Sequence, residues 1–223
     1  MTNGQLTCPL VIRTGNGAGV RFGAQHSQSI ENWTMMIPGL KVVAPSSPVD
    51  VIGLMVAAVR DNNPVIFHEH KALYAVKGEV PDGEIVDTLG TAKILRPGRD
   101  CTILALALMV PRALEAAGIL ARDHGIDAEV IDVRSLVPLD TQTMLGSVAK
   151  TGRLFTVEEN PRLLGWGAEI ASIVADEGFW DLDGPIVRIT TPHIPLPAAD
   201  HLEDLALPSA ARIVEKIVRV MNG

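Results

Sequence analysis

The sequence has few aromatic residues, few cysteines and no excess of positive charge, and each shortage excludes a class of protein. Aromatic residues make up 4% of the 223 residues, although hydrophobic residues make up 47%. The core must therefore be built from aliphatic side chains, a composition typical of parallel strands covered by helices on both faces. The length allows one large domain or two smaller ones with a substantial core.

The charge and the hydrophobic runs argue against nucleic acid and membranes as partners. The formal net charge is -7, whereas phosphate binding needs a surplus of lysine and arginine. The longest fully apolar run, residues 103–110, is far shorter than the roughly 20 residues of a membrane span. The first residues lack the charged head and apolar core of a secretory signal. We expect a cytoplasmic protein, or one of the mitochondrial matrix if the source is eukaryotic.

Cysteine is too scarce for a disulfide framework or a structural zinc site. Cys8 and Cys101 lie far apart and form no CxxC pair. We expect two reduced thiols.

Short β-rich apolar runs alternate with helix-length segments along the whole chain, which predicts an α/β fold with βαβ units and a mostly parallel sheet. We expect strands at residues 9–13, 41–44, 64–69, 101–106, 128–133, 153–158 and 185–190. We expect helices at about residues 26–37, 48–60, 109–123, 140–150, 165–178 and 208–221.

The helix expected at residues 48–60 has a well-marked start. Ser47 can cap it, Pro48 occupies its first turn, and Asp50 places a negative charge at its positive end. Its body is apolar all round, which predicts that it is buried.

A change of composition at residues 76–90 indicates a linker between two α/β units. This stretch contains three glycines, a proline and four acidic residues with no clear period. We divide the chain into a first unit at residues 1–78, a linker at 79–90 and a second unit at 91–223. The first unit is short for a domain and resembles the back half of one.

Two short motifs have a structural and a functional interpretation. The glycines of "GNGAGVRFG" (15–23) do not have GxGxxG spacing, so a flexible loop is favoured over a phosphate cradle. "HEH" (68–70) on a strand would place His68 and His70 on one face. No third ligand is evident in the sequence, so a polar pair is favoured over a metal site.

The stretch "RDNNP" (60–64) closes the helix expected at 48–60. Asp, Asn and Pro favour helix exits, which is the simpler interpretation. The last helical carbonyls also lack partners within the helix and carry the negative end of its dipole. With the oxygens of Asp61 and Asn63, they could form a cage for a monovalent cation.

His26 is set in the polar stretch "RFGAQHSQS" (21–29), at the entry of the helix expected at 26–37. Ile30, Trp33 and Ile37 of that helix are expected to face the core. A histidine here is either a polar helix-start residue or a group for proton transfer and oxyanion stabilisation.

Several motifs taken together resemble one family. They are "GAQHSQS" (23–29), "PGLKVVAPSSP" (38–48), "RDNNPVIF" (60–67), "EHKALY" (69–74), "EVIDVRSLVPLD" (129–140) and "TVEEN" (156–160). The chain resembles the β subunit of thiamine-diphosphate-dependent 2-oxo acid dehydrogenases, the E1 component, including the acetoin dehydrogenase β subunits. The resemblance implies an incomplete pyrimidine-binding-type domain followed by a transketolase C-terminal domain.

The resemblance implies roles for particular residues. His26 matches the family's active-site histidine, which stabilises the reacting intermediate and helps to pass the acyl group to a lipoyl arm. The family's potassium site matches five positions, three through backbone carbonyls and two through side chains: Leu10, Ala58, Val59, Asp61 and Asn63.

The chain also departs from the family pattern. The glutamate that activates thiamine diphosphate in the family corresponds to a position before Met1, so we expect no cofactor-binding residue in this chain. The GDG…N signature for Mg²⁺ and diphosphate belongs to the α subunit and does not occur here. His193 stands where the family usually has an acidic residue.

Two functions follow as expectations. The first is the β-subunit part of an E1 that decarboxylates a 2-oxo acid, with pyruvate as the expected substrate, on thiamine diphosphate and transfers the acyl group to lipoamide. An acetoin dehydrogenase β subunit is an alternative. Its partners would be the E1 α subunit, the E2 lipoyl acyltransferase and a second β subunit. The alternative is a catalytically incomplete fragment that acts as a folding or oligomerisation module.

Overall fold

The computed structural model describes residues 4–223; residues 1–3 of the expected first unit lie outside it. Its strands are β1 (Val11–Asn16), β2 (Lys41–Val43), β3 (Val65–His70), β4 (Lys93–Arg96), β5 (Cys101–Ala105), β6 (Ala128–Asp132), β7 (Ser135–Val137), β8 (Leu154–Pro161) and β9 (Val187–Thr191). Its α-helices are α1 (Gly23–His26), α2 (Glu31–Met35), α3 (Pro48–Val59), α4 (Met109–Ile119), α5 (Thr141–Thr151), α6 (Trp166–Glu177), α7 (Asp200–Ala206) and α8 (Ala210–Met221).

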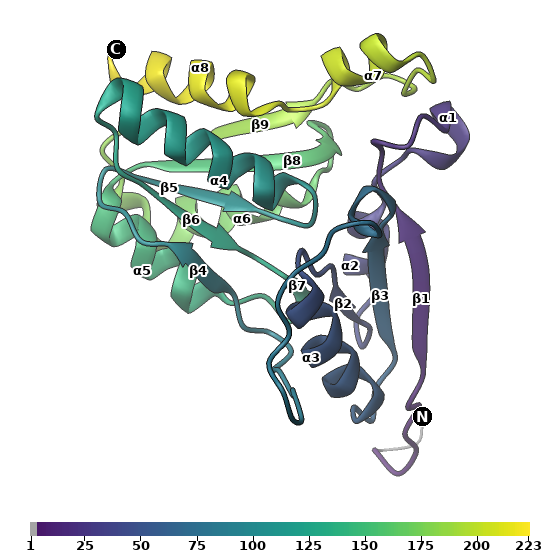
Figure 1. Cartoon of the computed structure of the whole chain (residues 1–223). Helices are drawn as coiled ribbons and strands as arrows, with labels where there is room; N and C mark the ends of the chain where they lie inside the picture. Colours follow the sequence, from purple (N-terminus) through teal and green to yellow (C-terminus); the bar gives the residue numbers. More distant parts are fainter. Residues whose placement is uncertain (1–3) are drawn as a thin grey trace.

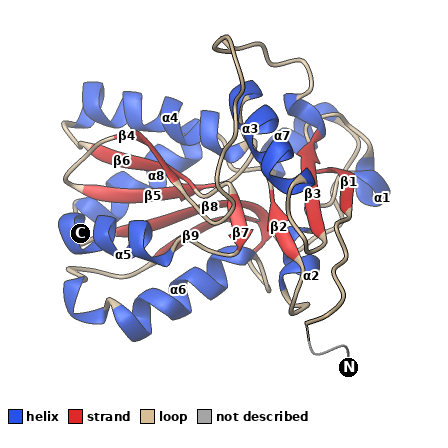
Figure 2. Cartoon of the chain, turned by 90° about the horizontal axis from the view of Figure 1, so that it is seen from below, coloured by secondary structure: helices blue, strands red, loops and turns tan. Residues whose placement is uncertain are grey.

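The strands form two sheets that lie side by side (Figures 1 and 2). The four-stranded sheet has the order β1-β3-β2-β7 and the five-stranded sheet the order β4-β6-β5-β8-β9. All pairs are parallel except those of β7 with β2 and β4 with β6. The α/β class with mostly parallel sheets is therefore confirmed.

The C-terminal unit (residues 91–223) has a sheet that is covered on both faces (Figure 1). Phe155 of β8 packs with Ile213 in the core beneath α4 and α8. Its neighbour Leu154 faces the other way and packs with Trp166 beneath α5 and α6. The alternation of side chains along one strand thus supplies both cores.

The N-terminal unit (residues 4–78) is thinner. Its own core cluster consists of Val43, Leu54, Ala58, Val65 and Phe67, between α3 and one face of the sheet. β1 is the edge strand of this sheet in the described residues. The expected burial of α3 all round is wrong, because the sheet covers one side of the helix only and Val51 is 40% exposed.

A buried guanidinium joins the two units. Arg134, between β6 and β7, donates through Nη1 to Oδ1 of Asp50 on α3 at 2.9 Å and to Oδ2 of Asp87 at 2.5 Å. Its Nη2 donates to the carbonyl oxygen of Thr91 at 3.1 Å. β7 itself pairs with β2, so the sheet of the N-terminal unit includes a strand from the C-terminal unit.

Local sequence patterns predict most of the helices and strands correctly. The Ser47 cap is confirmed, since its hydroxyl oxygen accepts from the Asp50 amide at 3.2 Å. The helix expected at residues 109–123 ends as an α-helix at Ile119 and continues as a π-helical turn over Leu120–His124. β4, β7 and α7 were not expected from the sequence, because each is short and lacks a clear period.

The prediction of one continuous helix at residues 26–37 is wrong. The structure has α1 and α2 there, separated by residues 27–30. Asn16 Oδ1 accepts the amide of Ile30 at 3.0 Å, which stops α2 from extending backwards. Trp33 is 67% exposed and Ile37 49% exposed, so these side chains do not face the core as expected.

No helix in residues 4–223 combines the length and hydrophobicity that a bilayer crossing requires. Cys8 is exposed and Cys101 is buried, and both are free thiols as expected. Burial raises the pKa of the Cys101 thiol to about 12, so this sulfur is an unreactive part of the core.

Candidate active site

His26 lies beyond the carboxyl end of β1, on a stretch that we call the His26 segment (residues 17–30). The carboxyl ends of parallel strands are where α/β folds place their binding sites. α1 is a single turn without a side-chain cap, and His26, its last residue, is exposed. The segment lies at the end of the N-terminal unit next to α7 (Figure 1).

His26 lines a cavity of about 380 Å³, which we call the His26 cavity. Its lining residues are Gly15, Phe22, Gln25, His26, Gln28, Ile30 and Lys71. The imidazole of His26 lies edge-on to the ring of Phe22, with the ring centroids 6.5 Å apart. The imidazole, ammonium and amide groups in this lining suit a polar reactant that exchanges a proton with a side chain.

Lys71 ties the cavity wall to the His26 segment. Its Nζ donates to the carbonyl oxygen of His26 at 2.5 Å. Burial lowers the pKa of the Lys71 ammonium, although nearby carboxylates of Glu159 and Glu203 oppose this shift. The contact fixes the last turn of α1 and brings a positive charge to the cavity.

The His26 cavity has no carboxylate among its lining residues. The expectation that this chain has no cofactor-binding glutamate stays a prediction.

Glu159 of β8 holds both ends of the His26 segment. Its Oε1 accepts the amide of Ala18 at 2.6 Å and the hydroxyl of Ser29 at 2.8 Å. Its Oε2 lies 2.9 Å from Nε2 of His70. Burial would raise the pKa of the Glu159 carboxyl, but His70 and the segment's two donors lower it to about 2.

The hydrogen bonds of His70 define its tautomer. Nδ1 of His70 accepts the amide of Ala72 at 3.3 Å, so the proton lies on Nε2 and is donated to Glu159. Gly17 packs directly against this imidazole, and a β-carbon there would collide with the ring. Its φ of 83° also favours glycine.

A second buried polar cluster lies beside the first. Glu31 accepts from Asn16 Nδ2 at 2.6 Å and from Asn160 Nδ2 at 3.0 Å. Burial raises the pKa of Glu31, and the charge of Glu159 raises it further. The cluster joins β1, α2 and β8 and so adds to the contacts between the two units.

The "HEH" motif does not form a metal site. His68 and His70 are both buried, but Nε2 of His68 contacts the hydroxyl of Thr34 at 3.1 Å, whereas His70 contacts Glu159. Burial lowers the pKa of His68 to about 4, so its ring is neutral. Within residues 4–223, no three side chains of His, Cys, Asp or Glu are grouped as metal ligands.

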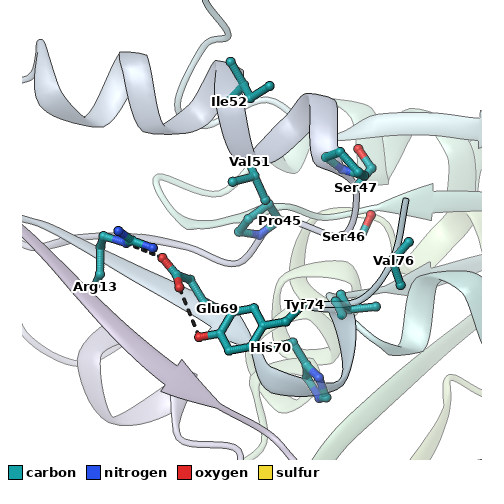
Figure 3. Close-up of a pocket in the computed structure, with 12 residues that line it drawn as sticks. Arg13, Pro45, Ser46, Ser47, Val51, Ile52, Glu69, His70, Tyr74 and Val76 are labelled. Carbon is teal, nitrogen blue, oxygen red and sulfur yellow. Dashed lines mark hydrogen bonds and ion pairs between the residues drawn. The ribbon is translucent and has the colours of Figure 1, made fainter. Parts of the chain in front are cut away.

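Glu69 lines another cavity, of about 360 Å³, between β3 and the start of α3, and His70 belongs to the same lining (Figure 3). Arg13 Nε donates to its Oε1 at 2.5 Å and the Tyr74 hydroxyl donates to its Oε2 at 3.1 Å (Figure 3). The hydrogen bond from Arg13 lowers the pKa of Glu69 despite burial. Residues of the motif "EHKALY" thus line both cavities: Lys71 lines the His26 cavity, and Glu69 and Tyr74 line this one.

The residues expected to bind potassium lie around the exit of α3 and the start of β1. The Leu10 carbonyl accepts the amide of Val65 at 2.8 Å, and the Ala58 carbonyl accepts the amide of Asp61 at 3.3 Å. Asp61 Oδ1 accepts from Asn63 Nδ2 at 3.1 Å, and its Oδ2 accepts from Lys41. The potassium site therefore stays a prediction, and the Lys41 ammonium already contacts one of its expected carboxylate oxygens.

The fifth expected ligand is Val59, the last residue of α3, which could contribute only its carbonyl oxygen. Val59 is 64% exposed, so a cation there would remain close to solvent.

Two residues of the site, Lys71 and Glu159, were not singled out from the sequence. Both lie inside motifs that carried the family resemblance, "EHKALY" and "TVEEN". The signal for Glu159 was present, because acidic residues at the end of an apolar strand run need buried partners. The partners could not be identified, since they lie 89 to 141 positions away in the sequence.

The two halves of the chain match two domain families. The family model of the transketolase pyrimidine-binding domain matches residues 1–77. That of the transketolase C-terminal domain matches residues 90–213.

Relatives of known name are similar over the whole chain. The β subunit of acetoin:2,6-dichlorophenolindophenol oxidoreductase from Cupriavidus necator is 47% identical, over 100% of this chain and 66% of that protein. The β subunit of the pyruvate dehydrogenase E1 component from Rickettsia felis is 48% identical, over 99% of this chain and 67% of that protein. The chain spans about two thirds of the length of the curated relatives it matches.

Solved transketolase structures share the fold. A split gene transketolase, described as an inactive β4 tetramer, superposes with a TM-score of 0.78 at 24% identity, covering 99% of this chain and 70% of that chain. A transketolase mutant from Pichia stipitis gives a TM-score of 0.66 at 13% identity, covering 96% of this chain and 30% of that chain. With two domain matches, two kinds of relative and this fold, the chain belongs to the family of transketolase-like β subunits that includes those of the pyruvate dehydrogenase E1 component and of acetoin:2,6-dichlorophenolindophenol oxidoreductase.

Proposed function

We propose that the chain supplies His26 to the active site of a 2-oxo acid dehydrogenase E1, working as β subunit with an α subunit. The reaction is the oxidative decarboxylation of a 2-oxo acid, pyruvate in the first instance, with acyl transfer to lipoamide. The observation that carries this proposal is the exposed His26, held over a cavity on a segment that buried carboxylates fasten in place.

The cofactor of this reaction is thiamine diphosphate with Mg²⁺, held mainly by the α subunit, and it supplies the electron sink for decarboxylation. The contribution of this chain is a proton at the imidazole nitrogen of His26. From the mouth of the cavity, that imidazole can donate a hydrogen bond to a developing oxyanion or move a proton during acyl transfer. Lys71 fixes the His26 backbone and adds positive charge beside the developing negative charge.

The partners are the α subunit, the lipoyl acyltransferase E2 and a second β subunit. An apolar groove of about 790 Å³ opens where the two units meet, lined by Trp33, Met36, Leu164 and Trp166 among others. Trp33, Met36 and Leu164 are 67%, 79% and 74% exposed, respectively. Large exposed apolar side chains grouped in this way support protein contacts rather than a free surface.

The test compares two acceptors in a complex reconstituted with the α subunit of a pyruvate or acetoin relative. Lipoamide acylation depends on acyl transfer, whereas 2,6-dichlorophenolindophenol accepts electrons without it. We expect His26→Ala to lower lipoamide acylation by roughly 100-fold or more, and dye reduction much less. The control is His124→Ala, at an exposed histidine far along the chain.

Unchanged lipoamide acylation by His26→Ala would contradict the proposal. Running pyruvate and acetoin side by side separates the two substrate classes. A wild-type complex that reduces no dye with either substrate would favour the alternative, a module for folding or oligomerisation.

The alternative, a module for folding or oligomerisation, predicts that the isolated chain does not bind thiamine diphosphate in calorimetry but does associate with the α subunit. Tight binding of the cofactor by the isolated chain would exclude it.

A further inference from the structure

The His26 segment has little internal reason to hold one conformation. α1 is one turn of helix, and a helix of this length is not stable by itself. One backbone bond, from the Gly17 amide to the Gln28 carbonyl at 3.3 Å, closes the segment on itself. The position of His26 must therefore be determined by contacts from outside the segment.

Most of those contacts come from the C-terminal unit, and four of them reach two buried carboxylates. In addition, Lys71 Nζ donates to the His26 carbonyl and Asn160 Nδ2 donates to the Ser29 carbonyl. Glu159 accepts from Ala18 and Ser29, which lie on either side of His26. Glu203 of α7 accepts the amide of Gly19 at 2.7 Å and pairs with Arg21 at 2.9 Å. Glu203 therefore holds only the part before His26, whereas Glu159 joins both flanks.

We propose that Glu159 is the positioning residue of His26: its carboxylate, supplied by the C-terminal unit, clamps the two flanks of the His26 segment. His70 completes the clamp by donating its Nε2 proton to the other carboxylate oxygen. This inference rests on the proposed function only for its catalytic consequence; the clamp itself is a property of the chain.

The clamp needs a carboxylate and does not tolerate an amide. Glu159 Oε1 receives two donors and Oε2 receives a third, so both oxygens must be acceptors. In Glu159→Gln, an NH₂ group would face donors at one end or the other. A change of tautomer at His70 would not help, because its Nδ1 proton would then face the amide of Ala72.

The adjacent residue offers a matched control. Glu158 on the same strand is fully buried and accepts two bonds from Arg188, at 2.8 and 2.9 Å. Its further partners are Thr156 and Gly167, not the His26 segment. Glu158→Gln therefore removes a comparable buried carboxylate without touching the clamp.

The experiment measures hydrogen–deuterium exchange of the full chain together with the ¹³Cε1 NMR signal of His26. In Glu159→Gln, we expect roughly ten-fold or faster exchange in residues 17–30 and a His26 signal that moves towards that of a free histidine. In Glu158→Gln, we expect both readouts to stay at wild-type values even where the thermal midpoint falls. Wild-type exchange and an unchanged His26 signal in Glu159→Gln would overturn the inference.

A second variant serves if Glu159→Gln does not fold. Ser29→Ala removes one donor of the clamp, and we expect a smaller rise in exchange confined to the same residues. No rise in Ser29→Ala would also overturn the inference. In the complex, Glu159→Gln should lower kcat for lipoamide acylation with little change in KM. Since exchange and NMR need no activity, failure of the clamp and failure of the proposed function give different results.

Discussion

The two units of this chain differ in how completely they are packed. The C-terminal sheet has helices on both faces and two large cores. The N-terminal unit has one small core cluster and leaves apolar side chains in solvent, with Leu10 49%, Ile12 45% and Ile52 38% exposed. Leu10 and Ile12 lie at the edge strand β1, which has no further partner in the described residues.

The less complete unit carries His26, the proposed catalytic residue, and the more complete unit supplies the buried carboxylates that contact its segment. His26 belongs to the N-terminal unit, yet the buried ionic groups around it, Glu159 and Glu203, come from the C-terminal unit. Arg134 likewise reaches from the C-terminal unit to Asp50 of α3. This difference in packing indicates that the C-terminal unit acts as a scaffold for the His26 segment.

We expect the greatest loss of stability when a buried phenylalanine is replaced by alanine, and the same substitution can be made in the core of each unit. Phe155 and Phe67 are both fully buried, one in each unit. Each change to alanine should cost about 3–5 kcal/mol. We expect Phe155→Ala to speed hydrogen exchange in both units, because the N-terminal unit depends on the scaffold. Phe67→Ala should speed exchange in the N-terminal unit and leave β5 and β8 protected.

The same two variants can also contradict the proposed dependence of the N-terminal unit on the C-terminal unit. If Phe155→Ala left the exchange of β1 and β3 at wild-type rates, the N-terminal unit would be stable by itself. If Phe67→Ala opened both units equally, the chain would be a single cooperative unit.

The next effect concerns the guanidinium that joins the units. Arg134 is 5% exposed and pairs with Asp50, which is 2% exposed. Arg134→Met leaves the buried Asp50 carboxylate with only the more distant Lys93 ammonium, at 3.4 Å, as a cationic partner. We expect this loss to cost about 3 kcal/mol in urea unfolding. The control, Arg122→Met, removes an exposed pair with Asp123 and should cost less than about 1 kcal/mol. Equal effects of the two substitutions would show that the junction is not a significant source of stability.

A smaller effect concerns pH at the same junction. Burial raises the pKa of Asp132 to about 7, although the hydroxyl of Ser46 donates to its carboxylate. The folded chain thus holds a proton that the unfolded chain releases near pH 4. This stability is present below about pH 4 and is lost as the pH rises towards 7.

Asp132→Asn should flatten this dependence, because the amide can still accept from the Arg134 amide and donate to Ser46. We expect the variant to gain stability relative to wild type as the pH rises from 4.5 to 8, measured by urea unfolding at the two pH values. The opposite sign applies to Glu159, whose stabilising charge is lost as the pH falls from about 4.5 to 2. Parallel pH profiles for variant and wild type would contradict the assignment of Asp132.

The sequence predicted most regular elements because their patterns are local. The cap at Ser47 and the long apolar strands depend on neighbours in sequence, and they hold. β7 could not be predicted, since its three residues become a strand only by pairing with β2. The interruption at residues 27–30 was missed for a similar reason, because Asn16 takes the amide that a longer helix would use.

The site was predictable in part. The motif singles out His26, and the structure places it, exposed, in the lining of a cavity. Its catalytic role stays a prediction. The carboxylates that contact its segment could not be predicted. Nothing near Glu159 in the sequence indicates that Ala18 and Ser29 are its partners. Positioning groups are found by tertiary contact, whereas the residue they position can be found by its motif.

The smallest expected effect concerns potassium, which we propose to bind near Asp61 and Asn63. A cation at ten times its dissociation constant stabilises the folded state by about 1.4 kcal/mol, equivalent to roughly 3–6 °C for a chain of this size. We expect the thermal midpoint to be higher in KCl than in choline chloride at equal ionic strength. Asn63→Ala should remove the difference, and the exposed Asn222→Ala should keep it. Equal midpoints of the wild-type chain in the two salts would contradict the site.

A further variant distinguishes a true site from general screening. Burial acts to raise the pKa of Asp61, but the Lys41 ammonium and the hydrogen bonds from Asn63 together outweigh it and lower the pKa. The Lys41 ammonium therefore competes with potassium for the same carboxylate. Lys41→Met should lower stability in choline chloride and enlarge the gain on adding KCl. If the gain instead shrank, the ammonium would be helping to build the cation site, and the oxygens at the exit of α3 would not be sufficient by themselves.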